Sequence, residues 1–394
     1  MKRTVDVVVV GGGVIGSATA YYLAKEGAEV ALVERADVAS GTSSSCDGNV
    51  LAIDKMPGFD SQMTFKSQQL LEGLQSELGY DFEYRQLGST LAVEDDEEQV
   101  RVARDWVARQ SAAGLPMRYI EADDVHADEP LLAPDIVGLV ECASDCSLNP
   151  MALVYAFVQA ARQAGAEICP YMEVRSILRD GAGAVRGVDT SGGMICSPRV
   201  VLCAGVWTPG LAATVGVDIP IVPRKGHILV AERTARNGRR KVMEFGYLMA
   251  KFGGQEGRRV EPEMEHYGIA LVFEPTPHGN FLIGSSRQFV GFDTRCDVRV
   301  LQLMARRAIR FFPFIKDVNV IRSYAGLRPY TPDHLPIVSP VNEVPGLYVA
   351  AGHEGDGIGL SPITGKLMAE IVTGKPTSIP VEPLRLDRFN QDKK

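Results

Sequence analysis

A glycine-rich turn near the amino terminus constrains the fold of this chain more than any other feature. The sequence VVVVGGGVIGSATAYYLAK places an uninterrupted apolar run, residues 7–10, directly before Gly11, Gly13 and Gly16 and a helical pattern directly after them. A parallel strand that is buried on both faces has no polar side and therefore shows a continuous apolar run. The segment predicts a strand, a tight turn and a helix, the usual start of a doubly wound α/β domain.

The next residues complete a β-α-β unit. Gly27 ends the predicted helix, and EVALVE forms the second strand, which closes on Glu34. In the G-x-G-x-x-G pattern the first glycine permits the turn, the second admits a pyrophosphate and the third lets helix and strand pack closely. The helix amino terminus directs N–H groups at the phosphates, and the acidic residue can bind ribose hydroxyls. The unit therefore predicts an adenine dinucleotide, and because the acid disfavours a 2′-phosphate, NADP is the least expected.

Two later segments favour FAD over NAD. ASGTSSSCDGN, residues 39–49, is a run of small residues whose backbone amides can lie against an isoalloxazine edge or a pyrophosphate. GLYVAAGHEGDGIGLSPITGKLMAEIV, residues 346–372, again predicts a strand, a glycine turn and a helix. This late helix returns the chain to the cofactor and directs its amino terminus at the flavin N1–C2=O group, where negative charge accumulates on reduction.

The rest of the chain predicts two interleaved parts. Helical patterns cover residues 62–78 and 298–312, and Asn149 and Pro150 suit the start of another helix. Between residues 220 and 295, apolar and polar residues alternate as in a half-solvated antiparallel sheet. The predicted fold class is α/β, with a Rossmann-like FAD-binding domain interleaved with an antiparallel-sheet (α+β) substrate domain. The FAD-binding domain is predicted over residues 1–86, 147–219 and 326–394, and the substrate-binding domain over residues 87–146 and 220–325.

Composition excludes several classes of partner. A formal net charge of −8 argues against nucleic acid and anionic membranes. The seven cysteines include no CxxC pair, so no metal site is predicted. The apolar run at the amino terminus is too short to span a bilayer, and the few residues before it leave no room for a signal peptide, so a cytoplasmic location is expected. Two basic clusters are predicted to be solvated loop charge: Arg236, Arg239, Arg240, Arg258 and Arg259.

Five motifs together resemble the D-amino-acid oxidase-like FAD oxidoreductases. They are the opening fingerprint, VVLCAGVWTPGL, GNFLIGSSRQFVGFDT, GLRPYTPDHLPIV and GHEGDGIGLSPITGKLMAE. That family includes glycine oxidase, sarcosine oxidase and the flavoprotein subunits of proline, hydroxyproline and opine dehydrogenases. The resemblance implies oxidation of a small carboxylated amine by hydride transfer from Cα to flavin N5, followed by hydrolysis of the imine.

The resemblance also implies a role for Arg328. In amino-acid-oxidising relatives, the arginine of a G-[LF]-R-P element holds the substrate carboxylate beside the flavin, and Arg328 occupies that place in GLRP. A guanidinium offers two parallel donors that match a carboxylate; the alternative is a structural salt bridge. Further catalytic candidates are His227, Tyr247 and Tyr267 from the inserted sheet, for which ordinary core packing is the alternative.

The fingerprint and the resemblance together define the expected FAD contacts. The predicted cofactor-binding residues are Gly11, Gly13, Val14, Ile15, Gly16, Glu34, Arg35, Ser43, Ser44, Gly48, Asn49, Val174, Ala204, Gly205, Trp207, Gly326, Arg328, His353, Glu354, Gly355, Asp356, Gly357, Ile358 and Gly359. Some relatives attach FAD through a cysteine in the segment that matches AGLRPYTPD. This segment has no cysteine here, and Gly326 stands near the expected position, so non-covalent FAD is predicted.

Two electron acceptors are considered for the reduced flavin: another protein, as in a dehydrogenase, and oxygen, as in an oxidase. Some oxidases of the family place a lysine over the flavin. The chain has no lysine between Lys251 and Lys316, which favours a dehydrogenase. Lys225 could still take the place of that lysine, so an oxidase is the alternative. The tail GHEGDGIGLSPITG resembles subunits that form hetero-oligomers with a companion chain carrying further redox cofactors. The alternatives are a peroxide-producing oxidase of glycine, sarcosine or a D-amino acid, an FAD-dependent 2-hydroxy-acid or polyol-phosphate dehydrogenase, and a non-catalytic flavin-binding subunit.

Overall fold

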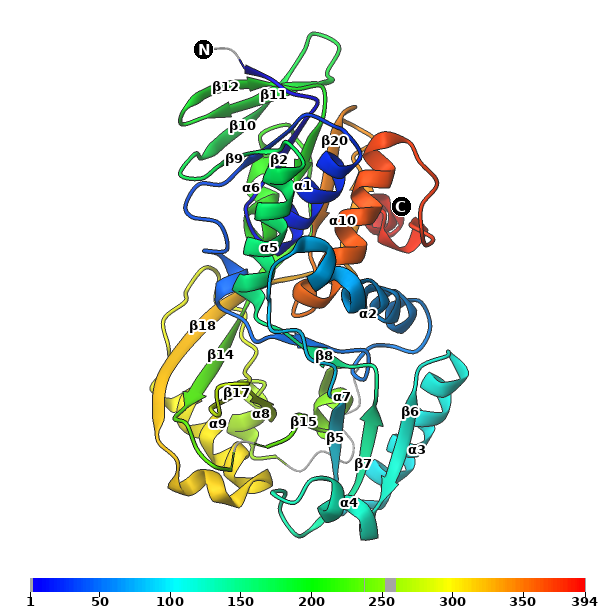
Figure 1. The fold of residues 1–394 in the computed structure, drawn as a ribbon, viewed down its shortest axis with the longest axis vertical. Helices are drawn as coiled ribbons and strands as arrows, with labels where there is room; N and C mark the ends of the chain where they lie inside the picture. Colours follow the sequence, from blue (N-terminus) through cyan, green and yellow to red (C-terminus); the bar gives the residue numbers. More distant parts are fainter. Residues whose placement is uncertain (1–2, 237, 252–259, 394) are drawn as a thin grey trace.

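A six-stranded sheet lies at the centre of the upper part of the molecule in Figure 1. The computed structural model describes residues 3–236, 238–251 and 260–393. The strand order is β19-β20-β13-β2-β3-β9, and every neighbouring pair is parallel except β19 with β20. The strands are β2 (Val7–Val10), β3 (Val30–Val33), β9 (Glu167–Cys169), β13 (Val200–Leu202), β19 (Ile337–Pro340) and β20 (Leu347–Ala351).

Both faces of this sheet are covered. Val7 and Val9 of β2 pack into one hydrophobic cluster, and Val8 and Val10 pack into another, because successive side chains of a strand point to opposite faces. The continuous apolar run of the sequence is thereby explained. The covering helices are α1 (Val14–Lys25), α2 (Phe59–Leu78), α5 (Pro150–Gln163), α6 (Thr208–Ala213) and α10 (Gly357–Thr373).

Helix α5 begins where the sequence predicts. The Asn149 side chain accepts a hydrogen bond from the Ala152 N–H at 3.1 Å, and Pro150 occupies the first helical position. Helix α1 packs against both α5 and α10, so the first and last helices of the chain are neighbours. This contact brings the two predicted glycine turns to the same side of the sheet.

Smaller sheets flank the first part. A four-stranded sheet has the order β1-β12-β11-β10, in which β11 and β12 form an antiparallel hairpin. A second, two-stranded sheet joins β4 and β8. The strands are β1 (Arg3–Thr4), β4 (Asn49–Val50), β8 (Cys146–Ser147), β10 (Val174–Arg179), β11 (Val185–Thr190) and β12 (Gly193–Cys196).

An eight-stranded sheet forms the lower part in Figure 1, with the order β18-β14-β17-β16-β15-β5-β7-β6. The prediction of a purely antiparallel sheet was wrong at one pair: β15 runs parallel to β5, which comes from a distant segment of the chain. The mixed α/β class is confirmed, while the exact domain boundaries stay a prediction. The strands are β5 (Ser89–Glu94), β6 (Met117–Glu121), β7 (Ile136–Cys142), β14 (Val222–Ala231), β15 (Lys241–Glu244), β16 (Val272–Pro275), β17 (Phe281–Gly284) and β18 (Val320–Tyr330).

Helices and short turns complete this part. Helix α9 covers the sheet through Val300, Leu303 and Phe311 and ends one residue before the predicted boundary. The α-helices are α3 (Glu97–Ala112), α4 (Ala122–Asp128), α7 (Gly246–Lys251), α8 (Pro262–His266) and α9 (Val298–Phe311). The 3-10 turns are η1 (Thr42–Ser44), η2 (Gly205–Trp207), η3 (Pro313–Asp317), η4 (Glu382–Leu384) and η5 (Leu386–Lys393).

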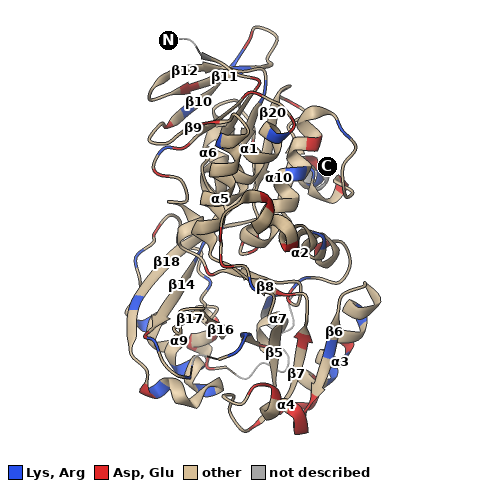
Figure 2. Cartoon of the chain, in the orientation of Figure 1, with Lys and Arg blue, Asp and Glu red and all other residues tan. Residues whose placement is uncertain are grey.

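Charged residues of both signs occur on both parts of the molecule (Figure 2). Arg236 and Arg239 are exposed, as predicted, whereas Arg258 and Arg259 lie outside the described residues. The prediction was wrong for Arg240, which is buried because its guanidinium pairs with three acidic side chains, those of Asp128, Glu129 and Glu141. No helix in the described ranges combines the length and the apolar character needed to cross a bilayer.

Candidate active site

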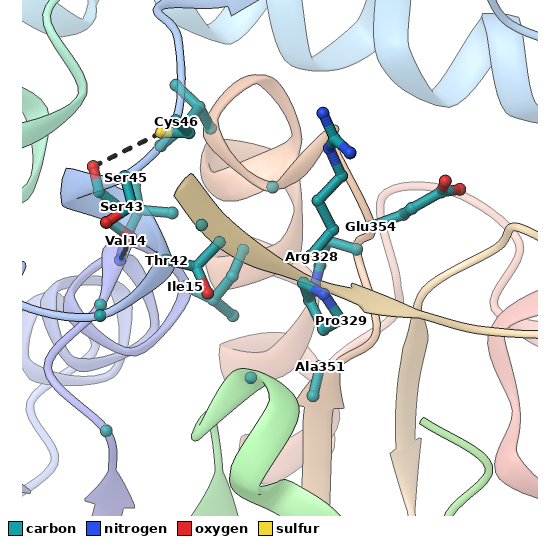
Figure 3. Close-up of a pocket in the computed structure, with 18 of the residues that line it drawn as sticks. Val14, Ile15, Thr42, Ser43, Ser45, Cys46, Arg328, Pro329, Ala351 and Glu354 are labelled. Atoms are coloured by element: carbon teal, nitrogen blue, oxygen red, sulfur yellow. Dashed lines mark hydrogen bonds between the residues drawn. The ribbon is translucent and has the colours of Figure 1, made fainter. Parts of the chain in front are cut away.

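A cavity of about 750 Å³ extends from the first glycine turn to the eight-stranded sheet. Its wall is formed by the turn between β2 and α1, the end of β3, the 40–54 segment, strands β14, β15 and β18, and residues 350–358. Figure 3 shows Val14 and Ile15 of α1, the 42–46 segment and Arg328 of β18 around this space. Segments from the two ends of the chain therefore share one site.

The first glycine turn has the geometry that the fingerprint requires. Gly11 has a φ of +112°, and a Cβ atom there would lie 2.6 Å from the Cys203 carbonyl oxygen. A Cβ at Gly16 would lie 1.9 Å from the Gly11 carbonyl oxygen, so only glycine allows this approach of helix and turn. Gly13 provides no side-chain cap for helix α1; the Ser43 Oγ atom accepts a hydrogen bond from the Val14 N–H at 3.1 Å, and Gly13, Val14 and Ile15 line the cavity.

The end of β3 supplies the features expected around a nucleoside. The Glu34 carboxylate accepts hydrogen bonds from the N–H groups of Gly12 at 2.7 Å and Ala36 at 2.9 Å, and it lines the cavity. The Arg35 guanidinium carbon lies 4.1 Å from the centroid of the Trp207 ring, also in the cavity wall. These contacts hold the Glu34 carboxylate where ribose hydroxyls would bind, and they place the stacked Arg35 and Trp207 side chains beside it.

The other end of the cavity carries the second helix amino terminus. Helix α10 begins without a side-chain cap, because Asp356 directs its carboxylate to the Lys55 ammonium at 2.8 Å instead.

In the 39–49 segment, the Asn49 Nδ2 group donates to Glu274 Oε2 at 2.8 Å, whereas the buried Asn49 Oδ1 atom has no hydrogen-bond partner. A bound donor would satisfy this oxygen. Both ends of the cavity therefore fit the groups of FAD.

Arg328 lies on β18 and reaches into the same cavity (Figure 3). Its guanidinium lies over Gly226, where a Cβ atom would be 2.4 Å from Nη1 and Nη2. The Nη1 group donates to the Ser286 carbonyl oxygen at 2.9 Å. Within the described residues Arg328 forms no ion pair, so the alternative of a structural salt bridge has no support. Burial and the nearby Arg287 charge lower the pKa of Arg328.

Tyr247 of α7 is the second predicted catalytic residue that the structure brings to the cavity. The Arg287 guanidinium carbon lies 4.0 Å from the centroid of its ring. Burial raises the pKa of Tyr247, but the charges of Arg287 and Lys251 outweigh this effect and lower the pKa below its ordinary value.

His227 and Tyr267 do not line the cavity. His227 is fully buried on β14: its Nδ1 atom lies 2.7 Å from Ser286 Oγ, and its Nε2 atom accepts a hydrogen bond from the Asp297 N–H at 3.2 Å. Tyr267 follows α8, and its ring packs edge-on against His266 at 4.8 Å. Both ring nitrogens of the histidine are therefore occupied by protein groups, which fits a structural role.

The predicted cofactor-binding residues also fall into two groups, those that line the cavity and those that do not. Gly16, Ser44, Gly48 and Gly359 lie behind the cavity wall and not on it. Ser44, for example, donates to the Gly41 carbonyl oxygen at 3.1 Å. The predicted residues on the wall are Gly11, Gly13, Val14, Ile15, Glu34, Arg35, Ser43, Asn49, Val174, Ala204, Gly205, Trp207, Gly326, Arg328, His353, Glu354, Gly355, Asp356, Gly357 and Ile358.

The environment of His227 gives a testable pH dependence. Burial lowers the pKa of His227 to about 4 in the folded protein, below the ordinary value of 6.5. Between these values only the unfolded chain takes up the proton, so the stabilisation is complete above pH 6.5 and falls as the pH drops towards 4. We expect a His227→Gln variant to lose less stability than the wild type from pH 7 to pH 5, by up to about 2 kcal/mol in denaturant unfolding. Parallel pH profiles of the two proteins would contradict this role.

The structure also reveals a cavity residue that the sequence reasoning overlooked. Lys241 of β15 is buried and lines the cavity, so the absence of lysine between Lys251 and Lys316 does not argue against a lysine in the site. Lys225, which kept the oxidase open, lies off the wall and donates to the Arg295 carbonyl oxygen at 3.2 Å. The alternation in KVMEF was a usable signal, because Lys241 and Met243 both face the cavity.

Comparisons with known proteins agree with this site. The family described as FAD dependent oxidoreductase (DAO) matches residues 6–371. Hydrogen cyanide synthase subunit HcnC of Pseudomonas aeruginosa is 28% identical to this chain, covering 100% of the chain and 98% of the relative. Glycine oxidase of Geobacillus kaustophilus is 29% identical, with 98% of each protein covered.

Solved structures extend the likeness to three dimensions. L-proline dehydrogenase from P. horikoshii has a TM-score of 0.88 at 25% identity, covering 100% of this chain and 99% of that one. Glycine oxidase from Geobacillus kaustophilus has a TM-score of 0.86 at 29% identity, covering 98% and 99%. The glycine turns, the shared cavity and the family match over almost the whole length lead to one conclusion: this chain belongs to the DAO family of FAD-dependent oxidoreductases.

Proposed function

We propose that this protein oxidises a small carboxylated amine, of the proline, hydroxyproline, sarcosine or opine kind. The observation that carries the proposal is Arg328, a guanidinium without an ion-pair partner among the described residues, in a cavity whose remaining wall fits FAD. The names of similar proteins, glycine oxidase and L-proline dehydrogenase, support an amino-acid substrate.

FAD, when bound, supplies the acceptor at N5 for a hydride from the substrate Cα. Arg328 binds the substrate carboxylate with two parallel N–H donors and thereby orients Cα. The reacting amine must be neutral, so the ammonium proton leaves to water before hydride transfer, and Tyr247, which lines the same cavity, hydrogen-bonds the neutral amine. The imine that results is hydrolysed by water.

We propose that the FAD is held without a covalent bond. Gly326 is the position where a cysteine was considered, and a Cβ atom there would lie 2.4 Å from the Ser45 carbonyl oxygen. Because this contact is with backbone, no side chain fits without displacing the 39–49 segment.

Electron transfer to a companion subunit in a hetero-oligomer is part of this proposal. It draws on the relative named as a subunit, hydrogen cyanide synthase subunit HcnC. A cytoplasmic location stays a proposal from the sequence.

The buried Lys241 in the cavity wall favours a second candidate, an oxidase that passes electrons to oxygen and forms peroxide.

Anaerobic flavin absorbance tests the function. We expect a carboxylated secondary amine to bleach the FAD-loaded protein, and the hydroxy acid with the same carbon skeleton to leave it oxidised. Bleaching by the hydroxy acid alone would instead support the 2-hydroxy-acid dehydrogenase, and no bleaching by any small substrate would support a non-catalytic flavin subunit. In air, one peroxide per substrate turned over identifies an oxidase, whereas turnover only with an artificial acceptor identifies a dehydrogenase.

A further inference from the structure

Three arginines from neighbouring strand segments lie close together on one face of the eight-stranded sheet, and among them Arg328 lines the cavity. Arg224 and Arg328 are direct partners in the β14–β18 register. Arg287 follows β17, and because side chains alternate along an extended segment, it shares a face with Ser285, which lines the cavity. Arg224 likewise shares a face with Gly226, another cavity residue.

Backbone pairing places Arg287 close to the Arg328 guanidinium. Lys225 and Gln288 form an antiparallel bridge, with N···O distances of 2.8 and 3.0 Å. In that register Arg287 stands opposite Gly226, the residue over which the Arg328 guanidinium lies. The nearby Arg287 charge accordingly contributes, after burial, to the lowered pKa of Arg328.

The three arginines differ in their counter-charges. Arg224 pairs with Glu354, whose carboxylate also lies 2.9 Å from His334 Nδ1. Arg287 rests on the Tyr247 ring and, like Arg328, takes part in no ion pair within the described residues.

The acidic residues of the wall do not neutralise these two cations. Asp54 and Asp356 both form ion pairs with Lys55, and Asp54 Oδ2 also lies 3.2 Å from Lys251 Nζ. Asp47 also lines the cavity and forms no ion pair with Arg287 or Arg328. Buried or half-buried charges are normally paired, so two adjacent unpaired guanidiniums favour a ligand with two negative groups.

We propose that the substrate is a dicarboxylic secondary amine, an N-(carboxyalkyl) amino acid, whose second carboxylate binds Arg287. This inference rests on the proposed function and makes its substrate class specific. Arg328 holds the carboxylate next to the reacting Cα, and Arg287 holds the carboxylate on the other arm of the amine. The Tyr247 ring supports the Arg287 guanidinium through a cation–π contact.

A matched substrate pair tests the proposal. Iminodiacetate and sarcosine both contain the N-substituted glycine unit and differ by one carboxylate; 2,2′-iminodipropionate and N-ethylalanine form a larger pair. Anaerobic stopped-flow reduction gives the apparent Kd of each compound for the FAD-loaded protein. We expect the wild type to bind the dicarboxylates at least tenfold more tightly than their partners.

Variants separate the second carboxylate from the first. Arg287→Met is expected to reduce the dicarboxylate-to-monocarboxylate selectivity at least tenfold, and Arg287→Lys to restore part of it. Arg322→Met, an exposed arginine on the same strand as Arg328, is the control and should keep the wild-type selectivity. FAD content and thermal unfolding establish that each variant is folded.

The outcomes distinguish the two proposals. If no carboxylated amine reduces the flavin, the proposed function is wrong. If amines reduce it but dicarboxylates bind no more tightly than monocarboxylates, or Arg287→Met leaves the selectivity unchanged, the function stands and the second-carboxylate site is refuted.

Discussion

A Gly13→Val variant is expected to fold normally and to purify without FAD. Gly13 has a φ of −79° and an extended ψ, a conformation that valine adopts readily. A Cβ atom there would meet only Ser43 Oγ, at 3.3 Å, a tight contact that a shift of this one side chain by a few tenths of an ångström relieves. The added side chain projects into the cavity where the pyrophosphate must lie, and we expect the FAD Kd to rise by 100-fold or more, about 3 kcal/mol.

The ratio of flavin absorbance near 450 nm to protein absorbance measures the loss, and thermal unfolding checks the fold. Gly73→Val is the matched control, because Gly73 is exposed within α2 and an added Cβ meets nothing within 4 Å. The control should retain a full complement of FAD. A yellow Gly13→Val protein with one FAD per chain would refute the assignment of the glycine turn to the pyrophosphate.

Replacing Arg328 by methionine is expected to raise the substrate Kd and to slow flavin reduction together, while FAD stays bound. Methionine keeps the unbranched stem but removes the fork that pairs with a carboxylate. Two charge-assisted hydrogen bonds are each worth about 1.5–3 kcal/mol, so the combined effect should reach about 100-fold or more. Anaerobic stopped-flow measurements over a range of substrate concentrations separate the two effects.

Arg328→Lys provides the control for charge. Lysine keeps the positive charge without the planar fork, so we expect it to recover part of the binding and little of the reduction rate. An Arg328→Met variant that reduces FAD at the wild-type rate would refute the carboxylate-binding role of this arginine.

The sequence was sufficient for those features in which local signals agree. The valine run before Gly11, the spacing of the glycines and the acid at the end of the second strand all predict the same β-α-β unit, and β2, α1 and β3 form it. The start of α5 was predictable for the same reason, because Asn149 and Pro150 act within one turn.

Features that depend on distant segments were not predictable. The parallel pairing of β15 with β5 joins residues about 150 positions apart, and no local pattern encodes it. His227 follows Gly226 at the start of the inserted sheet, yet its two ring nitrogens are taken by Ser286 and Asp297. The functional interest of Arg287 arises only from its register against β14, which the order of residues does not reveal.

The central claim is that Arg328 presents a carboxylate site directly beside the flavin. The most direct test titrates the FAD-loaded protein with a carboxylate that cannot be oxidised, such as acetate or benzoate, and records the flavin difference spectrum. A saturable perturbation of the flavin bands in the wild type, absent from Arg328→Met with its FAD still bound, is the predicted result. An identical perturbation in both proteins, or none in the wild type at any concentration, would contradict the placement of substrate and cofactor in one cavity.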